Sequence, residues 1–213
     1  MKRLLLAVFA VGLIGCAQQP ASSPGPAVTG GYTYDRYARS ADAWGYPNPV
    51  YKSWTTEQLQ KLVKAHPDSS TYNNDLGYVL ADHDKNLDEA EKLVRKALEL
   101  DKAERTKLKE KGLIDADEDK ENAAYLDSLG WVLYKKKNYA EAKKHLLEAV
   151  TADEGKHVEI FDHLADVHSA MGEKAEAVTV WQKALELPNV SKRDEARKEA
   201  IKKKLAAEPG QNP

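Results

Sequence analysis

Residues 125–150, YLDSLGWVLYKKKNYAEAKKHLLEAV, determine the fold of this chain. Apolar residues recur in this stretch at spacings of three and four, which places them on one side of an α-helix. The positions are Leu126, Leu129, Leu133 and Tyr134, followed by Ala142, Leu146 and Ala149. The stretch therefore predicts two amphipathic helices joined by a polar turn at residues 135–138. A hairpin of this size cannot bury its own apolar face, so it needs neighbours on both sides.

Two further stretches repeat this plan, one on each side. Upstream, the matching positions are Leu76, Gly77, Leu80, Ala90, Val94 and Ala97. Downstream, they are Phe161, Leu164, Ala165, Ala177, Trp181 and Ala184. In the central stretch the small residues Gly130 and Ala142 stand where the two apolar stripes meet, which lets the helices approach closely. Three such hairpins in succession indicate a repeat protein.

The three hairpins resemble the tetratricopeptide repeat (TPR) family, whose 34-residue unit is a helix-turn-helix. The second repeat departs from that pattern at Glu154, which replaces a terminal proline, and the third departs at His168 and Asn189. In the first repeat Asn73 replaces an aromatic residue, and one extra residue precedes Ala90. The resemblance implies an all-α fold, a right-handed solenoid of about three helical hairpins with capping helices and an extended N-terminal linker.

The sequence divides into four parts. These are a signal peptide (1–15), a tether (16–52), a helical domain (53–207) and a disordered tail (208–213). The repeats cover residues 70–102, 123–156 and 158–190. A helix capped by Ser53 or Thr55, with Glu57 or Gln58 completing a capping box, is expected to close one end of the stack. The polar helix at 192–207 is expected to close the other end.

An insertion at residues 102–121 separates the first two repeats. Its first part is rich in Lys and Glu and should prolong the preceding helix as far as Gly112. Asp115, Asp117 and Asp119 then match the first ligands of an EF-hand calcium loop, but Lys120 stands where that loop requires glycine. We therefore expect a solvated acidic loop and no metal site there.

The N-terminus begins with MKR and a short apolar run, which is typical of an export signal and too short for a permanent membrane span. The run ends at Cys16, and the residues before it resemble the lipobox of bacterial lipoproteins. That resemblance implies cleavage before Cys16 and acylation of its thiol and new amine, with palmitate among the chains attached. Ala17, rather than aspartate, favours the outer membrane in that family. Cys16 is the only cysteine, so no disulfide can form within the chain.

The tether contains an aromatic-rich segment, residues 32–51, YTYDRYARSADAWGYPNPVY. Its proline and glycine content argues against a helix. Two interpretations stay open. The segment is either an extended linker that packs along the helical domain, or a binding segment that contacts a partner or the domain's own groove. Arg36 and Arg39 give this segment positive charge.

Composition and motifs argue against several classes of function. The chain has 32 basic and 34 acidic residues, so nucleic acid is an unexpected partner. The motifs of metalloproteases, phosphate-binding loops and nucleophile elbows are missing from the sequence, and neither an enzyme nor a cofactor is expected. His163 and His168 lie five residues apart, about 140° around a helix, and so diverge as metal ligands. His168 is expected in the core.

The TPR resemblance also implies a binding groove, because the first helix of each repeat lines the concave face in that family. Carried onto this sequence, the groove residues are Asn74, Tyr78, Asp127, Trp131, Tyr134, Glu159, Asp162 and Asp166. The set combines aromatic residues, which give contact area at low entropy cost, with carboxylates that attract basic partners. We expect a basic or neutral extended segment with apolar anchors to bind there.

These features together predict a lipid-anchored TPR adaptor or scaffold in the bacterial envelope, at the periplasmic face of the outer membrane. The alternative is a structural or assembly component of an envelope, pilus, secretion or cell-wall machine that has no peptide-binding site. Binding of an extended peptide to the groove would distinguish the two.

Overall fold

The computed structural model describes residues 55–115, 119–189 and 191–208. The predicted signal peptide, Cys16, the tether with its aromatic-rich segment, and Asp117 lie outside these residues. The described part belongs to a single compact unit, residues 32–213.

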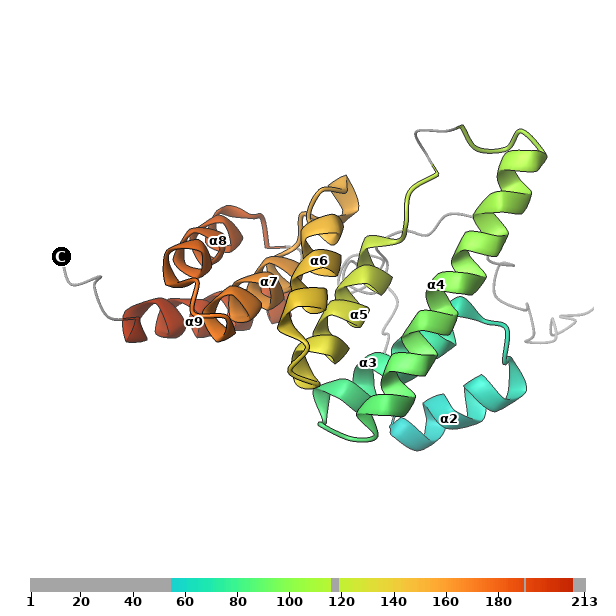
Figure 1. Ribbon diagram of the computed structural model, residues 1–213, viewed down its shortest axis with the longest axis horizontal. Helices are drawn as coiled ribbons and strands as arrows, with labels where there is room; N and C mark the ends of the chain where they lie inside the picture. The colour runs from blue at the N-terminus through green and yellow to red at the C-terminus, as the bar shows by residue number, and fades with distance from the viewer. Residues whose placement is uncertain (1–54, 116–118, 190, 209–213) are drawn as a thin grey trace, which may run out of the picture. The chain divides into compact units, whose positions relative to one another are not determined.

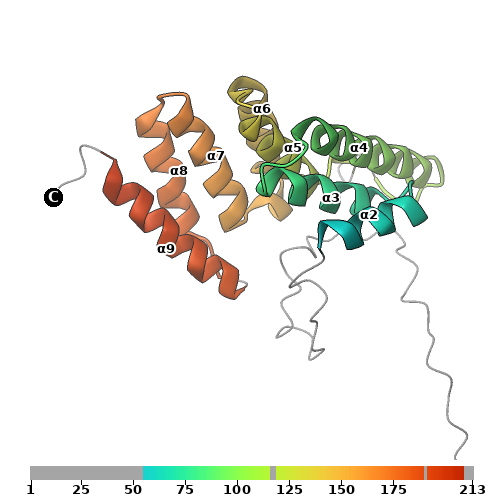
Figure 2. The ribbon, with the colours of Figure 1, turned by 90° about the horizontal axis from the view of Figure 1, so that it is seen from below.

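The described residues form α-helices and one short 3₁₀ helix, without a β-strand, so the predicted all-α fold is confirmed. The elements are α2 (Thr56–Ala65), α3 (Ser70–Asp82), α4 (Leu87–Glu110), α5 (Ala123–Lys135), α6 (Tyr139–Ala149), η2 (Asp153–Gly155), α7 (Val158–Ala170), α8 (Lys174–Glu186) and α9 (Lys192–Ala207). Figures 1 and 2 show three successive hairpins, α3–α4, α5–α6 and α7–α8, with α2 and α9 at their two ends. None of these helices is both long enough and apolar enough to cross a membrane.

Side-chain caps fix where the terminal helices begin. The Thr55 hydroxyl accepts from the Gln58 N–H while the Gln58 side chain accepts from the Thr55 N–H, so α2 starts with a capping box. Ser191 and Asp194 form the same reciprocal pair at the start of α9. These caps satisfy backbone N–H groups that the first helical turn leaves without partners.

The three hairpin turns share one backbone geometry. Asp84, Lys137 and Gly172 take positive φ angles of 52°, 61° and 80°. The N–H of the next residue then donates to a carbonyl five residues earlier, as in a Schellman motif. The bonds are Lys85 to Leu80, Asn138 to Leu133 and Glu173 to His168. The first turn has one more residue, Asn86, with φ 45°. This left-handed residue absorbs the extra position, and Ala90 is still fully buried.

Small residues set the distance between the helices of a hairpin. A Cβ atom on Gly77 would lie 2.6 Å from Val94 Cγ2, and one on Gly130 would lie 2.5 Å from Leu146 Cγ. Both distances are shorter than real Cβ contacts, so glycine is required for the observed approach. Trp181, predicted in the core of the third hairpin, is buried.

Asn73, the residue that replaces an aromatic in the first repeat, is fully buried. Its amide nitrogen donates to the carbonyl oxygens of Pro67 at 2.9 Å and Ser69 at 2.7 Å. The asparagine therefore holds the connection between α2 and α3 by hydrogen bonds, where an aromatic side chain would hold it by packing.

The insertion begins as a continuation of α4, as predicted. This helix has 24 residues, against 11 in α6 and 13 in α8, and its last buried residue is Asp101. Gly112 follows the helix with φ 65°. Arg105 pairs with Asp101 and Asp119, and Lys109 pairs with Asp119 at 3.0 Å. Asp119, which matches a ligand position of a calcium loop, therefore forms ion pairs with two cations of α4.

The contact at Gly130 generates a test of the hairpin packing. Gly130→Ala should lower the free energy of unfolding, because the new methyl group collides with Leu146 in a well-packed interior; Gly130→Leu should cost about 1–3 kcal/mol or more. Leu146→Ala alone should cost about 2–5 kcal/mol.

Urea unfolding of the double variant Gly130→Ala/Leu146→Ala checks the contact. Its loss should be smaller than the sum of the two single losses, because the truncated leucine leaves room for the methyl group. Leu147→Ala, which changes an exposed leucine on the same helix, is the control and should give additive losses with Gly130→Ala. Strict additivity with Leu146→Ala would contradict the observed packing.

Candidate protein-binding face

The eight predicted groove residues lie on α3, α5 and α7, the first helices of the three hairpins. We call this set the first-helix face. It consists of Asn74, Tyr78, Asp127, Trp131, Tyr134, Glu159, Asp162 and Asp166. The structure joins all of them except Asn74 through hydrogen bonds, ion pairs and ring contacts, in which His163, Arg197 and Lys204 also take part.

Two hydrogen bonds connect different hairpins across this face. The Tyr78 hydroxyl of the first hairpin donates to Glu159 Oε1 of the third at 2.6 Å. Asp127 Oδ1 of the second hairpin lies 2.7 Å from His163 Nδ1 of the third. Asp127 and His163 are 0% and 1% exposed. Buried polar groups of this kind are stable only when paired, so these bonds fix the hairpins relative to one another.

An aromatic stack covers the Asp127–His163 pair. The Trp131 ring stacks on the His163 ring, with 4.1 Å between the ring centres, and on the Tyr134 ring, with 5.0 Å between the ring centres. Lys135 Nζ lies 5.1 Å from the centre of the Trp131 ring, within reach of a cation–π contact. Trp131 and Tyr134 are half-buried, whereas Asp127, Glu159 and Asp162 are fully buried. The stack is therefore the part of the first-helix face that offers aromatic surface to a partner.

The carboxylates of the third hairpin are paired with cations of α9. Arg197 donates to Glu159 at 2.6 Å and to Asp162 at 3.0 Å. Lys204 donates to Asp162 and to Asp166, each at 2.7 Å. Asp162 also accepts from the buried Trp181 indole at 3.0 Å. At the sequence level these carboxylates were expected to face a partner; in the structure the chain's own C-terminal helix neutralises them.

Burial and attraction oppose each other at the two cations. Burial alone would lower the pKa of Arg197, but attraction to Glu159 and Asp162 outweighs it, and the pKa is raised. Burial likewise disfavours charge on Lys204, yet the pKa of its ammonium is raised by attraction to Asp162 and Asp166. Both side chains therefore stay charged, and α9 is held to α7 by ion pairs rather than by neutral hydrogen bonds.

Two buried polar atoms on the first-helix face lack a hydrogen-bond partner among the described residues. One is Asn74 Oδ1, an acceptor on α3, and the other is the Trp131 indole N–H, a donor on α5. The Asn74 amide nitrogen makes a single bond, to Asp75 at 3.3 Å. A buried donor or acceptor without a partner costs about 1–3 kcal/mol.

Sequence reasoning missed His163, Arg197 and Lys204. The sequence raises His163 only as a possible metal ligand, and its pairing with Asp127 across hairpins depends on contacts that sequence spacing does not show. The sequence predicts Arg197 and Lys204 only as part of the polar helix at 192–207 that closes the stack. Their seven-residue spacing, which equals that of Glu159 and Asp166, was the available signal. His168, expected in the core, is buried and bonds to Glu173 at 2.6 Å.

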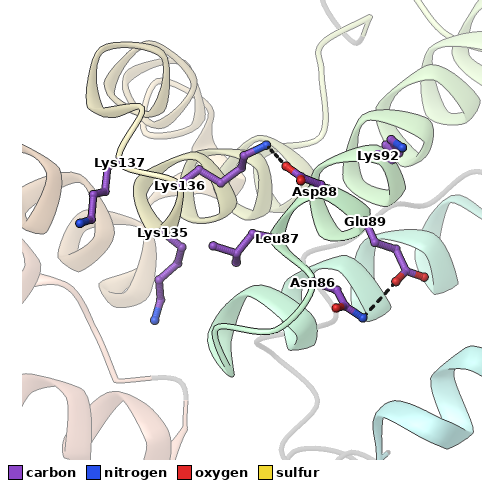
Figure 3. Close-up of a pocket in the computed structure, with 8 residues that line it drawn as sticks. All are labelled: Asn86, Leu87, Asp88, Glu89, Lys92, Lys135, Lys136 and Lys137. Atoms are coloured by element: carbon purple, nitrogen blue, oxygen red, sulfur yellow. Dashed lines mark hydrogen bonds and ion pairs between the residues drawn. The ribbon is translucent and has the colours of Figure 1, made fainter.

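An open pocket of about 800 Å³ lies outside the first-helix face, between the start of α4 and the end of α5. Figure 3 shows Lys135, Lys136 and Lys137 beside Asn86, Leu87 and Asp88. Lys136 pairs with Asp88 at 2.6 Å and with Glu91 at 2.7 Å, and Lys135 pairs with Asp84 at 2.9 Å. The lysines of one hairpin thus neutralise acids of the preceding hairpin, and this pocket is a repeat-to-repeat contact. Within the described ranges no cluster of three His, Cys, Asp or Glu residues could hold a metal ion.

Residues 57–104 and residues 122–152 each match tetratricopeptide repeat families. The crystal structure of MamA is similar over 70% of this chain and 77% of its own, with 18% identity and a TM-score of 0.46. The crystal structure of yeast Tom70 is similar over 72% of this chain, with 19% identity and a TM-score of 0.47, and the match spans only 30% of Tom70. No curated protein sequence matches the chain.

The fold and the matched segments define a class: this is an all-helical chain of hairpins, two of which match tetratricopeptide repeat models. The third hairpin, α7–α8, has the same turn geometry and the same buried alanine in its second helix. Stacked helical repeats form extended surfaces on which a partner can bind.

His157 links the first-helix face to pH. It caps α7, because its ring Nδ1 accepts from the Glu159 N–H at 3.2 Å, and its Nε2 lies 3.5 Å from Asp194 of α9. Burial lowers the pKa of His157 below its ordinary value, although Asp194 opposes this effect. In the unfolded chain histidine titrates near pH 6.5. The folded state therefore loses stability as pH falls through 6.5 toward the lower folded pKa, because the unfolded state binds more protons.

His157→Asn should reduce this loss, because asparagine also caps helices and does not titrate. We expect the difference in unfolding free energy between pH 7 and pH 5, measured by urea titration, to be smaller in His157→Asn than in wild type. Substitution of the exposed His66 by asparagine serves as the control and should leave the difference unchanged. Equal losses in wild type and His157→Asn would contradict this role.

Proposed function

We propose that this protein is a lipid-anchored TPR adaptor of the bacterial envelope that binds a protein partner through its first-helix face. The observation that carries the proposal is the half-exposed stack of Trp131 and Tyr134, whose indole N–H has no acceptor among the described residues. Aromatic side chains at such positions are frequent hot spots of protein recognition, because they bury large areas at low entropy cost.

The surroundings of the stack define the partner. The four carboxylates of the face are already paired within the chain: Asp127, Glu159, Asp162 and Asp166. We therefore expect them to form no new ion pairs with a partner. Their negative charge still disfavours an acidic partner. Affinity then comes from apolar anchors on the half-exposed aromatic stack. A basic or neutral extended segment with apolar side chains fits this description. Residues 32–51 of the same chain have that character and are a second candidate occupant.

The anchor rests on the sequence. Cys16 follows an export signal in a lipobox-like context, and the tether of residues 16–52 separates it from the helical domain. Two or more acyl chains on one cysteine hold a protein stably on a bilayer, while a single chain does not. Ala17 favours the outer membrane. The adaptor would then work at the periplasmic face, within reach of a flexible tether.

A structural or assembly role without a peptide ligand is the second candidate. The pairing of the first-helix carboxylates within the chain favours it, because a face whose charges are already satisfied has less to offer a ligand. In that case partners would contact the outer surfaces of α4, α6 and α8 rather than the first-helix face.

A photo-crosslinking experiment separates the two candidates. A photoreactive amino acid at Tyr134 should capture a specific partner in living cells, whereas the same amino acid at the exposed Leu147 of α6 should not. Capture at Leu147 alone would reject the first-helix face and support the assembly role.

Trp131→Phe tests the aromatic stack with the partner so identified. Phenylalanine keeps an aromatic ring in the stack but offers less contact area than indole, so binding should weaken by about 1 kcal/mol, or roughly fivefold in Kd. Calorimetric titration measures the change, and thermal unfolding verifies that stability is retained. An unchanged Kd would show that the indole ring makes no contact with the partner.

Cys16→Ser tests the anchor, because the hydroxyl cannot replace the thiol that the lipoprotein pathway acylates. Wild type should incorporate labelled palmitate and fractionate with outer membranes, and the variant should do neither. Ala17→Asp is the matched control for sorting: it should keep the label and move the protein to inner membranes. A variant that stays membrane-bound, together with an unlabelled wild type, would reject lipidation.

A further inference from the structure

Helix α9 occupies the place of the first helix of a fourth hairpin. It packs against both helices of the preceding hairpin, α7 and α8 (Figure 2), as α7 itself packs against α5 and α6. The two helices can therefore be compared directly, since each is a first-helix element laid on the hairpin before it.

The comparison shows that α9 is held by far less apolar surface. The buried apolar residues of α7 are Val158, Ile160, Leu164, Ala165 and Val167. In α9 the only buried apolar residue is Ile201, with Leu205 half-buried beside it. Burial of apolar area is the dominant favourable term in packing one helix against another. The end of the stack is thus its weakest apolar contact.

Ion pairs between α9 and α7 take the place of that missing apolar contact. Arg197 and Lys204 stand seven residues apart on α9, and Glu159 and Asp166 stand seven residues apart on α7, with Asp162 between them bonded to both cations. Seven residues correspond to about 10.5 Å along a helix. The two helices run side by side with their charges in register. We call these five residues the charge seam.

Polar contacts also hold both ends of α9. Near its start, Asp194 lies 3.5 Å from His157, and Lys198 donates to the Leu187 carbonyl. Just past its end, Glu208 accepts from Lys174 at 2.7 Å. Contacts of this kind weaken with salt and give up little apolar burial when they open.

We propose that the charge seam is a docking site for a basic helix of a partner protein, and that α9 is the resident occupant which this helix replaces. The inference deepens the proposed function and rests on it: it names the partner's structure at the third hairpin, a helix with two cationic side chains two turns apart. The exchange conserves the ion pairs. A buried pair that loses one partner costs several kcal/mol, so the carboxylates of α7 favour whichever basic helix is present.

The exchange also explains why α9 is so polar. A helix that leaves the stack must be stable in water, and α9 begins with a capping box and exposes charged residues on its outer side. When it leaves, the apolar surface around Trp181 and Val158 becomes available to the incoming helix.

A pair of double variants with equal change of net charge tests the seam in the full-length chain. Arg197→Gln/Lys204→Gln removes both seam cations, whereas Lys202→Gln/Lys203→Gln removes two exposed lysines of the same helix. Hydrogen exchange of α9 amides should accelerate at least tenfold in the first variant and less than twofold in the second, with α3–α6 unchanged in both. Equal protection of α9 in the two variants would overturn the seam.

Binding in trans then tests the docking site. A labelled synthetic peptide of residues 189–208 should bind the Arg197→Gln/Lys204→Gln protein at least tenfold more tightly than wild type. The same peptide carrying Arg197→Glu and Lys204→Glu should not bind. Failure of the natural-sequence peptide to bind the variant would overturn the proposal. Partner capture at Tyr134 reports on the first-helix face separately, so the proposed function stands even if this inference falls.

Discussion

Close contact between the two helices of each hairpin is the constraint on which the rest of this structure depends. Gly77 lies against Val94 and Gly130 against Leu146 at distances that leave no room for a Cβ atom. The two helices of a hairpin meet tightly. The apolar residues of the hairpin therefore also contact the next hairpin in the stack. The first helices α3, α5 and α7 are thereby brought side by side, and their polar residues come together on one face.

The first-helix face contains buried carboxylates, and each of them is paired with another residue of the same chain. Stacking buries Asp127, Glu159 and Asp162, and a buried carboxylate without a partner is expensive. His163 pairs with the first of these, while Tyr78 and Arg197 bond to the second. These bonds cross from hairpin to hairpin, so the same interactions that satisfy the charges also fix the relative positions of the repeats. The first-helix face is accordingly both a structural element and a candidate recognition surface.

The C-terminal helix ends the stack in a way that differs from the repeats before it. Where α7 contributes a continuous apolar surface, α9 contributes Ile201 and two cations. Ion pairs join particular residues at a fixed register, whereas the hydrophobic effect is non-directional. A repeat domain with one end held by charge has a natural site for exchange, and that site adjoins the aromatic stack of Trp131 and Tyr134.

The sequence by itself determined the helices, their pairing and the identity of the repeats. The reason is that these depend on local quantities: the spacing of apolar residues, small residues at fixed positions, and caps such as Thr55. It also located the eight residues of the first-helix face. Only the tertiary structure decided which of them remain accessible, because Asp127 and Glu159 find their partners at residues 36 and 38 positions away. No pattern along the chain specifies such a pairing, since it arises when separate helices pack together.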